Sequence, residues 1–409
     1  METIKADVII CGAGPAGAAC AIRLAGSGLE VALLDKAIFP RDKTCGDALS
    51  IDVINQLELL SPELAKEFSE LSAKTSSYGV RIFSPSHEHI DIPFIQNDKI
   101  ACGYISPRMD FDNLLLMHAK KYSNIHIHEN CSVEKLSRTR EVVIAHCGDK
   151  EFIASLIIGA DGAHSMIAKV FGNFKVELDH YTAGLRVYYE GITGLQIDNY
   201  IEIHFLKDVL PGYLWIFPLP GNKANVGIGV PSSLIAKKKI NLRETLQRLL
   251  VSNEHLKERF KDATALETAK GYGLPLGSKK RKISGERFLL AGDAASMIDP
   301  LSGEGIGNAI RCGRVAAEHA MECFKYQDFS ASFNKAYDKE VYRRMWKELR
   351  ISRIMQKIFT HGWILTLLVK NGNKSKYLKK LLTDALGNSS KKKHLIRRPS
   401  FYWELFKGG

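Results

Sequence analysis

The fold of this chain is decided by the stretch Val8-Ile9-Ile10-Cys11-Gly12-Ala13-Gly14-Pro15-Ala16-Gly17, which runs on into small, helix-forming residues. The apolar run at its start is typical of a buried parallel strand, and the glycines after it form the pattern G-x-G-x-x-G. Gly12 suits a tight turn, Gly14 leaves room for a pyrophosphate at the backbone, and Gly17 lets the helix lie close to the strand. The helix N-terminus would therefore face the phosphates of a dinucleotide.

An acidic residue follows the next expected strand, residues 30–34, as this kind of motif requires. Asp35 lies at the distance along the chain that suits a partner for a ribose hydroxyl. The alternative is a glycine-rich turn followed by an ordinary surface acid. The order strand, glycines, helix and acid favours the nucleotide site. Its predicted cofactor-binding residues are Gly12, Ala13, Gly14, Pro15, Ala16, Gly17, Asp35 and Lys36.

Length and composition indicate a folded protein with more than one domain. The chain has 409 residues, which is long for a single core, and its 45% hydrophobic and 25% charged residues are ordinary for a soluble protein. The first residues lead directly into the expected strand, without a secretory signal pattern. The eight cysteines show no C-x-x-C pair and no metal-ligand spacing. We therefore expect reduced thiols, a cytoplasmic location and no metal site.

The net charge of +12 is concentrated at the C-terminal end. From residue 370 onward eleven basic residues face two acidic ones, a net charge of +9. The preceding residues 354–369 are mostly apolar but too few to span a bilayer, which takes about 20 residues. An apolar helix beside a basic tail favours attachment to the anionic inner face of a membrane. A core-packing helix followed by a solvated tail is the alternative, and no recognised motif supports a nucleic-acid partner.

Two later stretches repeat the pattern of a buried strand that ends in a glycine-rich acidic turn. One strand ends at Asp161 and Gly162, and another ends at Gly292 and Asp293. After the second, the turn at residues 299–308 opens a helix whose free N–H groups can stabilise negative charge. Arg108 lies just upstream of a further expected helix, where its guanidinium can meet an anionic cofactor or form a surface salt bridge.

A second, β-rich region lies between these elements. Residues 79–100 and 180–230 contain extended runs punctuated by glycine and proline, as in an antiparallel sheet. In one run, Tyr213, Trp215 and Phe217 fall on one face because side chains alternate along a strand. Gly227 and Gly229 would leave open volume beside this aromatic wall, suited to a long apolar ligand. Ordinary aromatic packing within a sheet core is the alternative.

The three nucleotide elements together resemble the para-hydroxybenzoate hydroxylase type of flavoprotein, in which FAD lies extended across all three. The resemblance implies that the first glycines hold the pyrophosphate and that Asp35 holds the adenosine ribose. It places Arg108 and Asp293 at the ribityl and phosphate portion, and Gly305 and Ile306 at the isoalloxazine. Asp161, with its D-G turn, and Gly292 would support the same site.

The aromatic run is similar to the signature of the geranylgeranyl reductase family, Y-x-W-x-F-P followed by G-x-G. Pro218 completes the first half of that signature, and the loop at residues 39–46 and the turn at residues 299–306 have counterparts in the same family. The resemblance covers about residues 5–320; Lys169 departs from it, standing where many relatives carry arginine. It implies a flavin enzyme that reduces isolated double bonds of a prenyl lipid, with electrons from NAD(P)H or a ferredoxin.

This chemistry needs an acid as well as a hydride, because an unactivated alkene accepts hydride only when a proton makes it cationic. The family resemblance makes Cys45, with Gly46, the candidate catalytic residue beside the flavin. Tyr213 and Trp215 would stabilise developing positive charge through their ring faces. The predicted substrate-binding residues are Tyr213, Trp215, Phe217, Pro218, Gly227 and Gly229.

We therefore predict an α/β protein, α+β overall, with a Rossmann-like FAD-binding domain and an antiparallel substrate domain. The first would comprise residues 1–78, 101–178 and 270–325, the second residues 79–100 and 179–269, and a helical region with the basic tail residues 326–409. Two other functions remain open. A flavin monooxygenase or halogenase would carry W-x-W-x-I-P at the aromatic run, and an electron-transfer flavoprotein acting on a quinone would need clustered cysteines for an iron-sulfur module.

Overall fold

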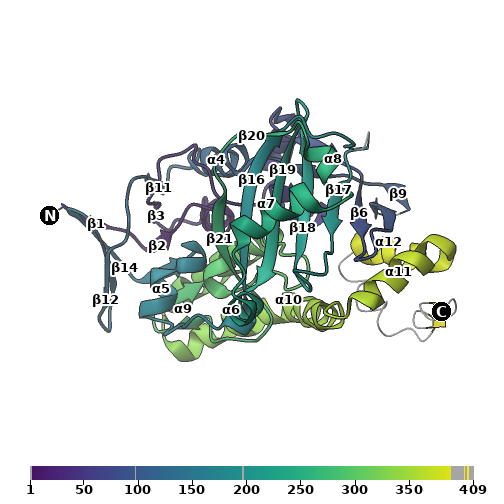
Figure 1. Ribbon diagram of the computed structural model, residues 1–409. Coiled ribbons are helices and arrows are strands. Elements are labelled where there is room, and N and C mark those ends of the chain that lie inside the picture. Colours follow the sequence, from purple (N-terminus) through teal and green to yellow (C-terminus); the bar gives the residue numbers. More distant parts are fainter. Residues whose placement is uncertain (1, 97, 196–197, 388–399, 401–402, 405–409) are drawn as a thin grey trace.

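Two large sheets with helices around them make up the architecture of the computed structural model (Figure 1). The structure describes residues 2–96, 98–195, 198–387, 400 and 403–404. One sheet is largely parallel and lies near the N-terminus, and the other is largely antiparallel and lies in the middle of the molecule. The mixed α/β class predicted from the sequence is confirmed.

The first sheet is built around the strand that the glycine motif follows. Strand β2 pairs in parallel with β3 on one side and with β15 on the other, and all its residues are buried. Such two-sided burial explains its uninterrupted apolar sequence. The six strands run in the order β11 (Ile125–His128), β3 (Val31–Leu34), β2 (Val8–Cys11), β15 (Leu156–Gly159), β23 (Phe288–Leu290) and β22 (Ser284–Gly285). A neighbouring sheet has the order β1 (Glu2–Lys5), β14 (Lys150–Ala154), β13 (Val143–Cys147) and β12 (Lys135–Arg138).

Helices cover the parallel sheet, and two of them touch through backbone. Helix α1 (Pro15–Leu24) packs along α9 (Ile306–Tyr326). A Cβ at Gly313 of α9 would lie 2.1 Å from the carbonyl oxygen of Ala16, so only glycine fits at this crossing. The other elements of this part are α2 (Ile51–Leu60), α3 (Pro62–Glu70), α4 (Arg108–Ala119), α5 (Met166–Val170), η1 (Gly162–His164) and η3 (Gly292–Ala295), while η2 (Leu178–His180) packs beside the large sheet.

The second sheet has a core face and a cavity face. Leu214 and Ile216 pack with helix α7 (Leu242–Ser252) in one apolar cluster, while Trp215 and Phe217 belong to a separate cluster on the other side. This alternation is the period of two that the sequence predicts. The strands are β20 (Thr264–Ala265), β16 (Tyr181–Glu190), β19 (Lys223–Pro231), β18 (Tyr213–Leu219), β17 (Ile201–His204), β6 (Gly79–Phe83) and β7 (His89–Pro93), in that order, with β21 (Lys270–Pro275) also paired to β16. Strand β21 thus continues this sheet beyond the predicted domain boundary at residue 269.

Short elements complete the two layers. A small antiparallel sheet has the order β4 (Ala48–Leu49), β10 (Gly103–Ile105) and β5 (Thr75–Ser77), and β8 (Ile95–Gln96) pairs with β9 (Lys99–Ile100). Helices α6 (Ser232–Lys238) and α8 (Lys257–Phe260) flank the large sheet. Strand β4 begins directly after the loop that carries Cys45, so this small sheet fixes the end of that loop.

The C-terminal region forms three helices, α10 (Ala331–Ile358), α11 (Gly362–Lys374) and α12 (Lys376–Gly387). Of these, α11 and α12 (yellow in Figure 1) lie at the end of the molecule opposite the N-terminus. The apolar segment 354–369 is divided between α10 and α11, and its Phe359, Leu365 and Leu368 are buried in a cluster with residues of β6 and β7. Residues 354–369 thus pack against the core, as the alternative interpretation of this segment expected.

Two statements about membranes follow from the described residues. No helix among them combines the length and the apolar character needed to cross a bilayer. The basic residues Lys391, Lys392, Lys393, Arg397, Arg398 and Lys407 lie outside the described residues. The predicted attachment through the basic tail therefore stays a prediction.

The close crossing of α1 and α9 predicts that even a methyl side chain at residue 313 lowers the stability of the protein. Alanine normally stabilises a helix by about 1 kcal/mol relative to glycine. In Gly313→Ala, however, the added methyl group meets backbone, and overpacking of this kind costs about 1–3 kcal/mol or more. We expect the free energy of unfolding, measured in urea, to fall by about 1–2 kcal/mol.

Gly271→Ala is the matched control, because a Cβ there meets its neighbours at 3.7 Å or more. Its unfolding free energy should change by less than about 0.5 kcal/mol. Equal stability of the two variants would contradict the packing argument.

Candidate functional site

A single cavity of about 890 Å³ connects the parallel sheet, the cavity face of the large sheet and the C-terminal helices. Most of the residues predicted from the sequence line it. They are Gly12, Gly14, Pro15, Ala16, Asp35, Lys36, Cys45, Gly46, Arg108, Asp161, Asp293, Gly305, Ile306, Tyr213, Trp215, Phe217 and Gly229. Ala13, Gly17, Gly292, Pro218 and Gly227 are not among the lining residues.

Gly12 and Gly17 of the turn pack against backbone, whereas Gly14 faces open space at the cavity. Gly12 has a φ of +96°, and a Cβ there would lie 2.4 Å from the carbonyl oxygen of Ala160. A Cβ at Gly17 would lie 1.8 Å from the carbonyl oxygen of Gly12. Gly14 differs, because its nearest neighbour would be the Nη2 atom of Arg41 at 3.7 Å. The open space at the N-terminus of α1 is therefore the place for an anionic group.

Asp35 ties this turn to the end of β3. Its Oδ2 accepts a hydrogen bond from the backbone N–H of Ala13 at 2.8 Å, and its Oδ1 accepts one from the N–H of Ala37 at 2.9 Å. The carboxylate is thus engaged by protein backbone. Each oxygen keeps a further lone pair, and Asp35 lines the cavity, so a ribose hydroxyl can still donate to it. The ribose contact stays a prediction.

Two arginines share one buried carboxylate beside the turn. Arg108 is the first residue of α4 rather than upstream of it, and its Nε and Nη2 donate to Asp112 at 2.6 and 2.7 Å. The Nη1 of Arg41 donates to the same carboxylate at 2.8 Å. Arg108 is only 3% exposed, so its salt bridge is buried, not a surface one. Two positive charges against one negative charge leave an excess that suits a pyrophosphate.

Sequence reasoning assigned no role to Arg41 or Asp112. The i,i+4 spacing of Arg108 and Asp112 is the signal that could have paired them. Arg41 lies 71 residues away from its partner, and no local pattern connects the two.

The other two acidic turns meet the cavity near the helix termini. Asp161 Oδ2 accepts from the N–H of Met166 at 2.7 Å, while its Oδ1 is buried without a partner among the described residues. Burial raises the pKa of this carboxyl group. Asp293 lies 3.7 Å from the ammonium group of Lys43. Gly305 caps α9 without a side-chain hydrogen bond, so the free N–H groups of that terminus are available to a ligand.

The aromatic wall is present, with one correction. Tyr213, Trp215 and Phe217 line the cavity, and successive ring centroids are 6.2 Å apart. The prediction of open volume at Gly227 is wrong, because a Cβ there would lie 2.2 Å from Cζ2 of Trp215: the indole fills that space. At Gly229 the nearest neighbour would be 3.7 Å away, and this glycine does line the cavity.

The loop that carries Cys45 lies against this wall. A Cβ at Gly46 would be 2.9 Å from Cε2 of Phe217, and the carbonyl oxygen of Cys45 accepts from the side chain of Asn225 at 2.8 Å. The same Asn225 accepts from the indole N–H of Trp215 at 2.8 Å. Hydrogen bonds therefore hold the cysteine loop and the aromatic strand in one fixed arrangement.

Beyond the aromatic wall the cavity is largely apolar, with Gln356 of α10 as a polar residue in its lining. Its lining there comes from strands β6, β7 and β17 and from helices α10, α11 and α12. These residues are Val80, Ile82, Ile92, Ile201, Ile203, Phe205, Met355, Phe359, Leu365, Leu368 and Leu382. Sequence reasoning did not foresee that the C-terminal helices contribute to the site, although the apolar run at residues 354–369 was the available signal.

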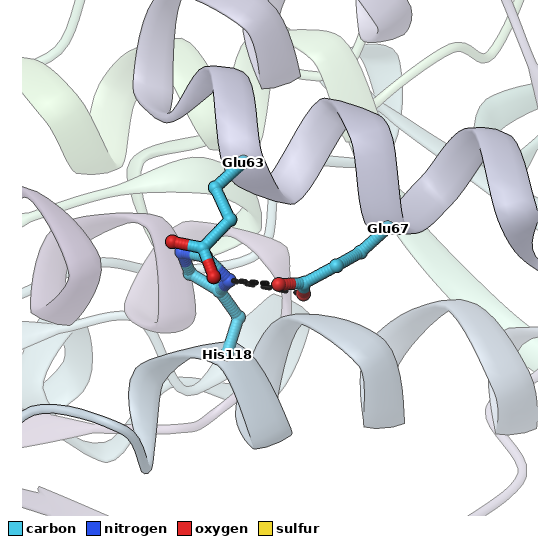
Figure 2. A group of neighbouring side chains, drawn as sticks. All are labelled: Glu63, Glu67 and His118. Carbon is cyan, nitrogen blue, oxygen red and sulfur yellow. Dashed lines mark hydrogen bonds and ion pairs between the residues drawn. The ribbon is translucent and has the colours of Figure 1, made fainter.

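One group of possible metal ligands occurs among the described residues, and it lies outside the cavity. Figure 2 shows Glu63 and Glu67 on α3 facing His118 on α4, with His118 Nδ1 3.0 Å from Glu67. Lys121 forms salt bridges with both glutamates, and Tyr122 bonds the other nitrogen of the histidine ring. These groups already satisfy one another and join α3 to α4.

Comparison with protein families gives two matches, which together span residues 5–272. Residues 5–186 match the FAD binding domain, and residues 184–272 match the geranylgeranyl reductase catalytic domain. The FAD cofactor that the resemblance to flavoproteins implies is thereby confirmed, and the chain is an FAD-dependent oxidoreductase.

Curated relatives cover most of the chain. A digeranylgeranylglycerophospholipid reductase from Methanocaldococcus jannaschii is 32% identical over 361 residues, 86% of this chain and 85% of its own length. One from Methanosarcina mazei is 30% identical, over 90% of this chain and 84% of its own. A menaquinone reductase from Mycolicibacterium smegmatis is 29% identical, over 86% of each.

Solved structures share the fold at lower identity. A geranylgeranyl bacteriochlorophyll reductase-like protein from Thermoplasma acidophilum superposes with a TM-score of 0.79 at 22% identity, covering 96% of this chain and 99% of its own. The halogenase PltM gives 0.74 at 21% identity, covering 95% of this chain and 85% of its own. These likenesses show the fold.

The shared carboxylate of Asp112 predicts that Arg41 matters for FAD affinity. Arg41→Ala removes a guanidinium beside the open N-terminus of α1 and leaves Arg108 neutralised by Asp112. A hydrogen bond to a charged group contributes about 1.5–3 kcal/mol, so the dissociation constant of FAD should rise about tenfold to a hundredfold. Quenching of flavin fluorescence on titration into the apoprotein measures it.

Arg23→Ala is the control, since Arg23 is half-exposed near the C-terminal end of the same helix and pairs only loosely with Glu318, at 3.6 Å. An unchanged affinity in Arg41→Ala would contradict a role for this side chain at the pyrophosphate.

Proposed function

Because the chain belongs to the geranylgeranyl reductase family of FAD-dependent oxidoreductases, we propose that it saturates isolated carbon–carbon double bonds of a geranylgeranyl-type lipid chain. One observation carries the proposal: the cavity is continuous from the glycine turn, past the aromatic wall, to an apolar end. A long hydrocarbon in the apolar part can thus reach the cofactor part without leaving the protein.

The residues at the polar end fit FAD. The Gly12 turn leaves a space at the N-terminus of α1, and Arg41 and Arg108 with Asp112 hold an excess positive charge there. Asp35 would accept from the adenosine ribose, and the α9 terminus at Gly305 and Ile306 would face the isoalloxazine. When reduced, the flavin supplies hydride.

The protein itself would bind the lipid, orient it and exclude water from the cavity. The apolar lining favours a prenyl chain and excludes water, which strengthens every electrostatic interaction inside. Tyr213 and Trp215 would present ring faces to positive charge that develops on the alkene. Cys45, on a loop that Asn225 holds against the wall, would position the reacting part of the lipid beside the flavin.

Electron supply and membrane contact are finer parts of the proposal. NAD(P)H or a ferredoxin would reduce the flavin. An anionic membrane would present the lipid, through the basic tail and the neighbouring helix α11, on which Trp363 is 60% exposed. Indole rings prefer the interface between water and lipid.

The proposed function predicts that the saturated lipid forms in the absence of oxygen. The flavin of the purified protein is reduced anaerobically with dithionite, and a geranylgeranyl lipid is added. Flavin reoxidation should accompany a gain of about two hydrogens per double bond, because one hydride and one proton saturate each bond. Absorbance and mass spectrometry follow the two events.

Reoxidation that requires oxygen and yields an oxygenated product would move the assignment to the monooxygenase or halogenase branch. Reoxidation by a quinone alone, with the lipid unchanged, would favour the electron-transfer alternative.

The apolar lining predicts that the prenyl site can be blocked without loss of FAD. Gly229→Leu places a side chain in the cavity at a position where the backbone has no positive φ and the neighbours are 3.7 Å or more away. The Michaelis constant for the lipid should rise at least about tenfold, while the FAD content stays that of the wild type. Gly229→Ala is the matched control, with a smaller effect in the same direction.

A further inference from the structure

Asp47 is a buried acid in the wall of the cavity that none of the assignments above uses. It follows Gly46, lines the cavity and has no measurable solvent exposure. Its φ of 64° lies in the left-handed region, which aspartate and asparagine tolerate better than most residues. The backbone at residue 47 is thus bent so that the side chain points between the cysteine loop and the large sheet.

The hydrogen bonds of Asp47 all fall on one oxygen. Oδ2 accepts from the hydroxyl of Tyr188 at 2.5 Å and from the amide of Asn225 at 2.8 Å. Oδ1 is buried and has no partner among the described residues. A carboxylate would leave this oxygen charged and unpaired, which is costly inside a protein. A neutral carboxylic acid fits the geometry, with Oδ2 as the carbonyl oxygen and the proton on Oδ1.

Burial favours the neutral form of Asp47, and the charges around it oppose that form. Burial raises its pKa to about 6, against the lowering effect of the hydrogen bonds from Tyr188 and Asn225 and of the charges on Arg186 and Arg108. Those charges are themselves engaged: Arg186 pairs with Asp42 and Glu267, and Arg108 pairs with Asp112. Burial is the larger effect, so the pKa of the carboxyl group stays above its usual value, at about 6.

We propose that Asp47 is the acid of the reaction and holds the transferable proton on Oδ1. This inference rests on the proposed function, since it supplies the proton that saturation of an unactivated alkene needs. The Oδ1–H bond breaks and a C–H bond forms at one alkene carbon, while hydride from the reduced flavin forms a C–H bond at the other. The aspartate is left as a carboxylate, which regains a proton, ultimately from solvent, before the next turnover.

The other candidates in the cavity fit this role less well. Cys45 offers a thiol, which is a far weaker acid than a carboxyl group. Tyr213 donates its hydroxyl to the carbonyl of Ser302, and burial raises its pKa further. Asp161 lies in the turn at the carboxyl end of β15, where its Oδ2 accepts from the N–H of Met166. Asp47 is joined to the aromatic wall by hydrogen bonds through Asn225, which also accepts from the indole of Trp215.

The test compares Asp47→Asn with Asp338→Asn, both in the FAD-loaded full-length protein. Asparagine keeps the size, the left-handed backbone and the acceptor oxygen, but it carries no acidic proton. Asp338 is a matched control, because it too is a largely buried carboxyl group with an unpartnered oxygen and a raised pKa, yet it does not line the cavity. Saturation of a geranylgeranyl lipid by the dithionite-reduced enzyme should fall at least about a hundredfold in Asp47→Asn, the typical share of acid catalysis. It should be unchanged in Asp338→Asn.

Two readouts do not depend on lipid turnover. Reoxidation of the reduced flavin by benzoquinone needs no protein acid and should stay within about twofold of the wild type in both variants. Carbon-13 spectra of protein labelled at the aspartate carboxyl carbon should show one group that titrates near pH 6 in the wild type and in Asp338→Asn and is missing from Asp47→Asn. Because the protonated form is the active one, saturation by the wild type should decline as the pH rises above that value.

The experiment distinguishes failure of the proposed function from failure of the role proposed for Asp47. If the wild type saturates no lipid, the proposed function fails, and the carboxyl titration still shows whether Asp47 holds a proton near neutral pH. If Asp47→Asn saturates the lipid at the wild-type rate, or if the Asp47 carboxyl group titrates below pH 4, Asp47 is not the acid.

Discussion

Contact of backbone with backbone around the first glycine turn is the constraint on which the rest of the structure depends. Gly17 brings helix α1 onto the turn at Gly12, and Gly313 brings helix α9 onto the carbonyl of Ala16. Side chains at these points would separate the two helices from the sheet. Because the helices are so close, the N-termini of both α1 and α9 open into the same cavity. One end can then hold phosphates and the other can face the ring system of the same cofactor.

The large sheet adds an apolar volume to this cofactor site, which the proposed lipid would occupy. Its strands alternate, so that Leu214 and Ile216 complete the core with α7 while Tyr213, Trp215 and Phe217 face the cavity. Because Gly227 has no side chain, the indole of Trp215 on the neighbouring strand fills the space that a Cβ would occupy. The wall is thereby rigid, and the apolar volume continues past it toward the C-terminal helices.

Local patterns were enough to predict much of this arrangement. The strands β2, β3 and β15, the acids at their ends and the alternation along β18 each follow from a short stretch of sequence. Partners far apart in the chain were out of reach. The pairing of Arg41 with Asp112, the contact of Gly227 with Trp215 across two strands and the burial of Asp47 under Tyr188 all depend on how separate elements pack. The division of residues 354–369 between α10 and α11 likewise follows from their packing on β6 and β7, which an apolar run alone does not reveal.

The buried polar groups of the cavity are consistent with a site that handles charge in a dry environment. Arg186 is fully buried, stacks over the ring of Tyr188 at 4.0 Å and pairs with carboxylates on two other segments. Such an arrangement costs desolvation energy, and well-packed apolar residues would often be at least as stable. Its effect is to fix Tyr188, and Tyr188 in turn fixes one oxygen of Asp47. Among the described residues the other oxygen has no partner, nor has the Nε of Arg186, so an unsatisfied acceptor of this network belongs to a group that can carry a proton. We therefore relate this buried ionic network to function rather than to stability, because it holds the carboxyl group of Asp47 in one orientation.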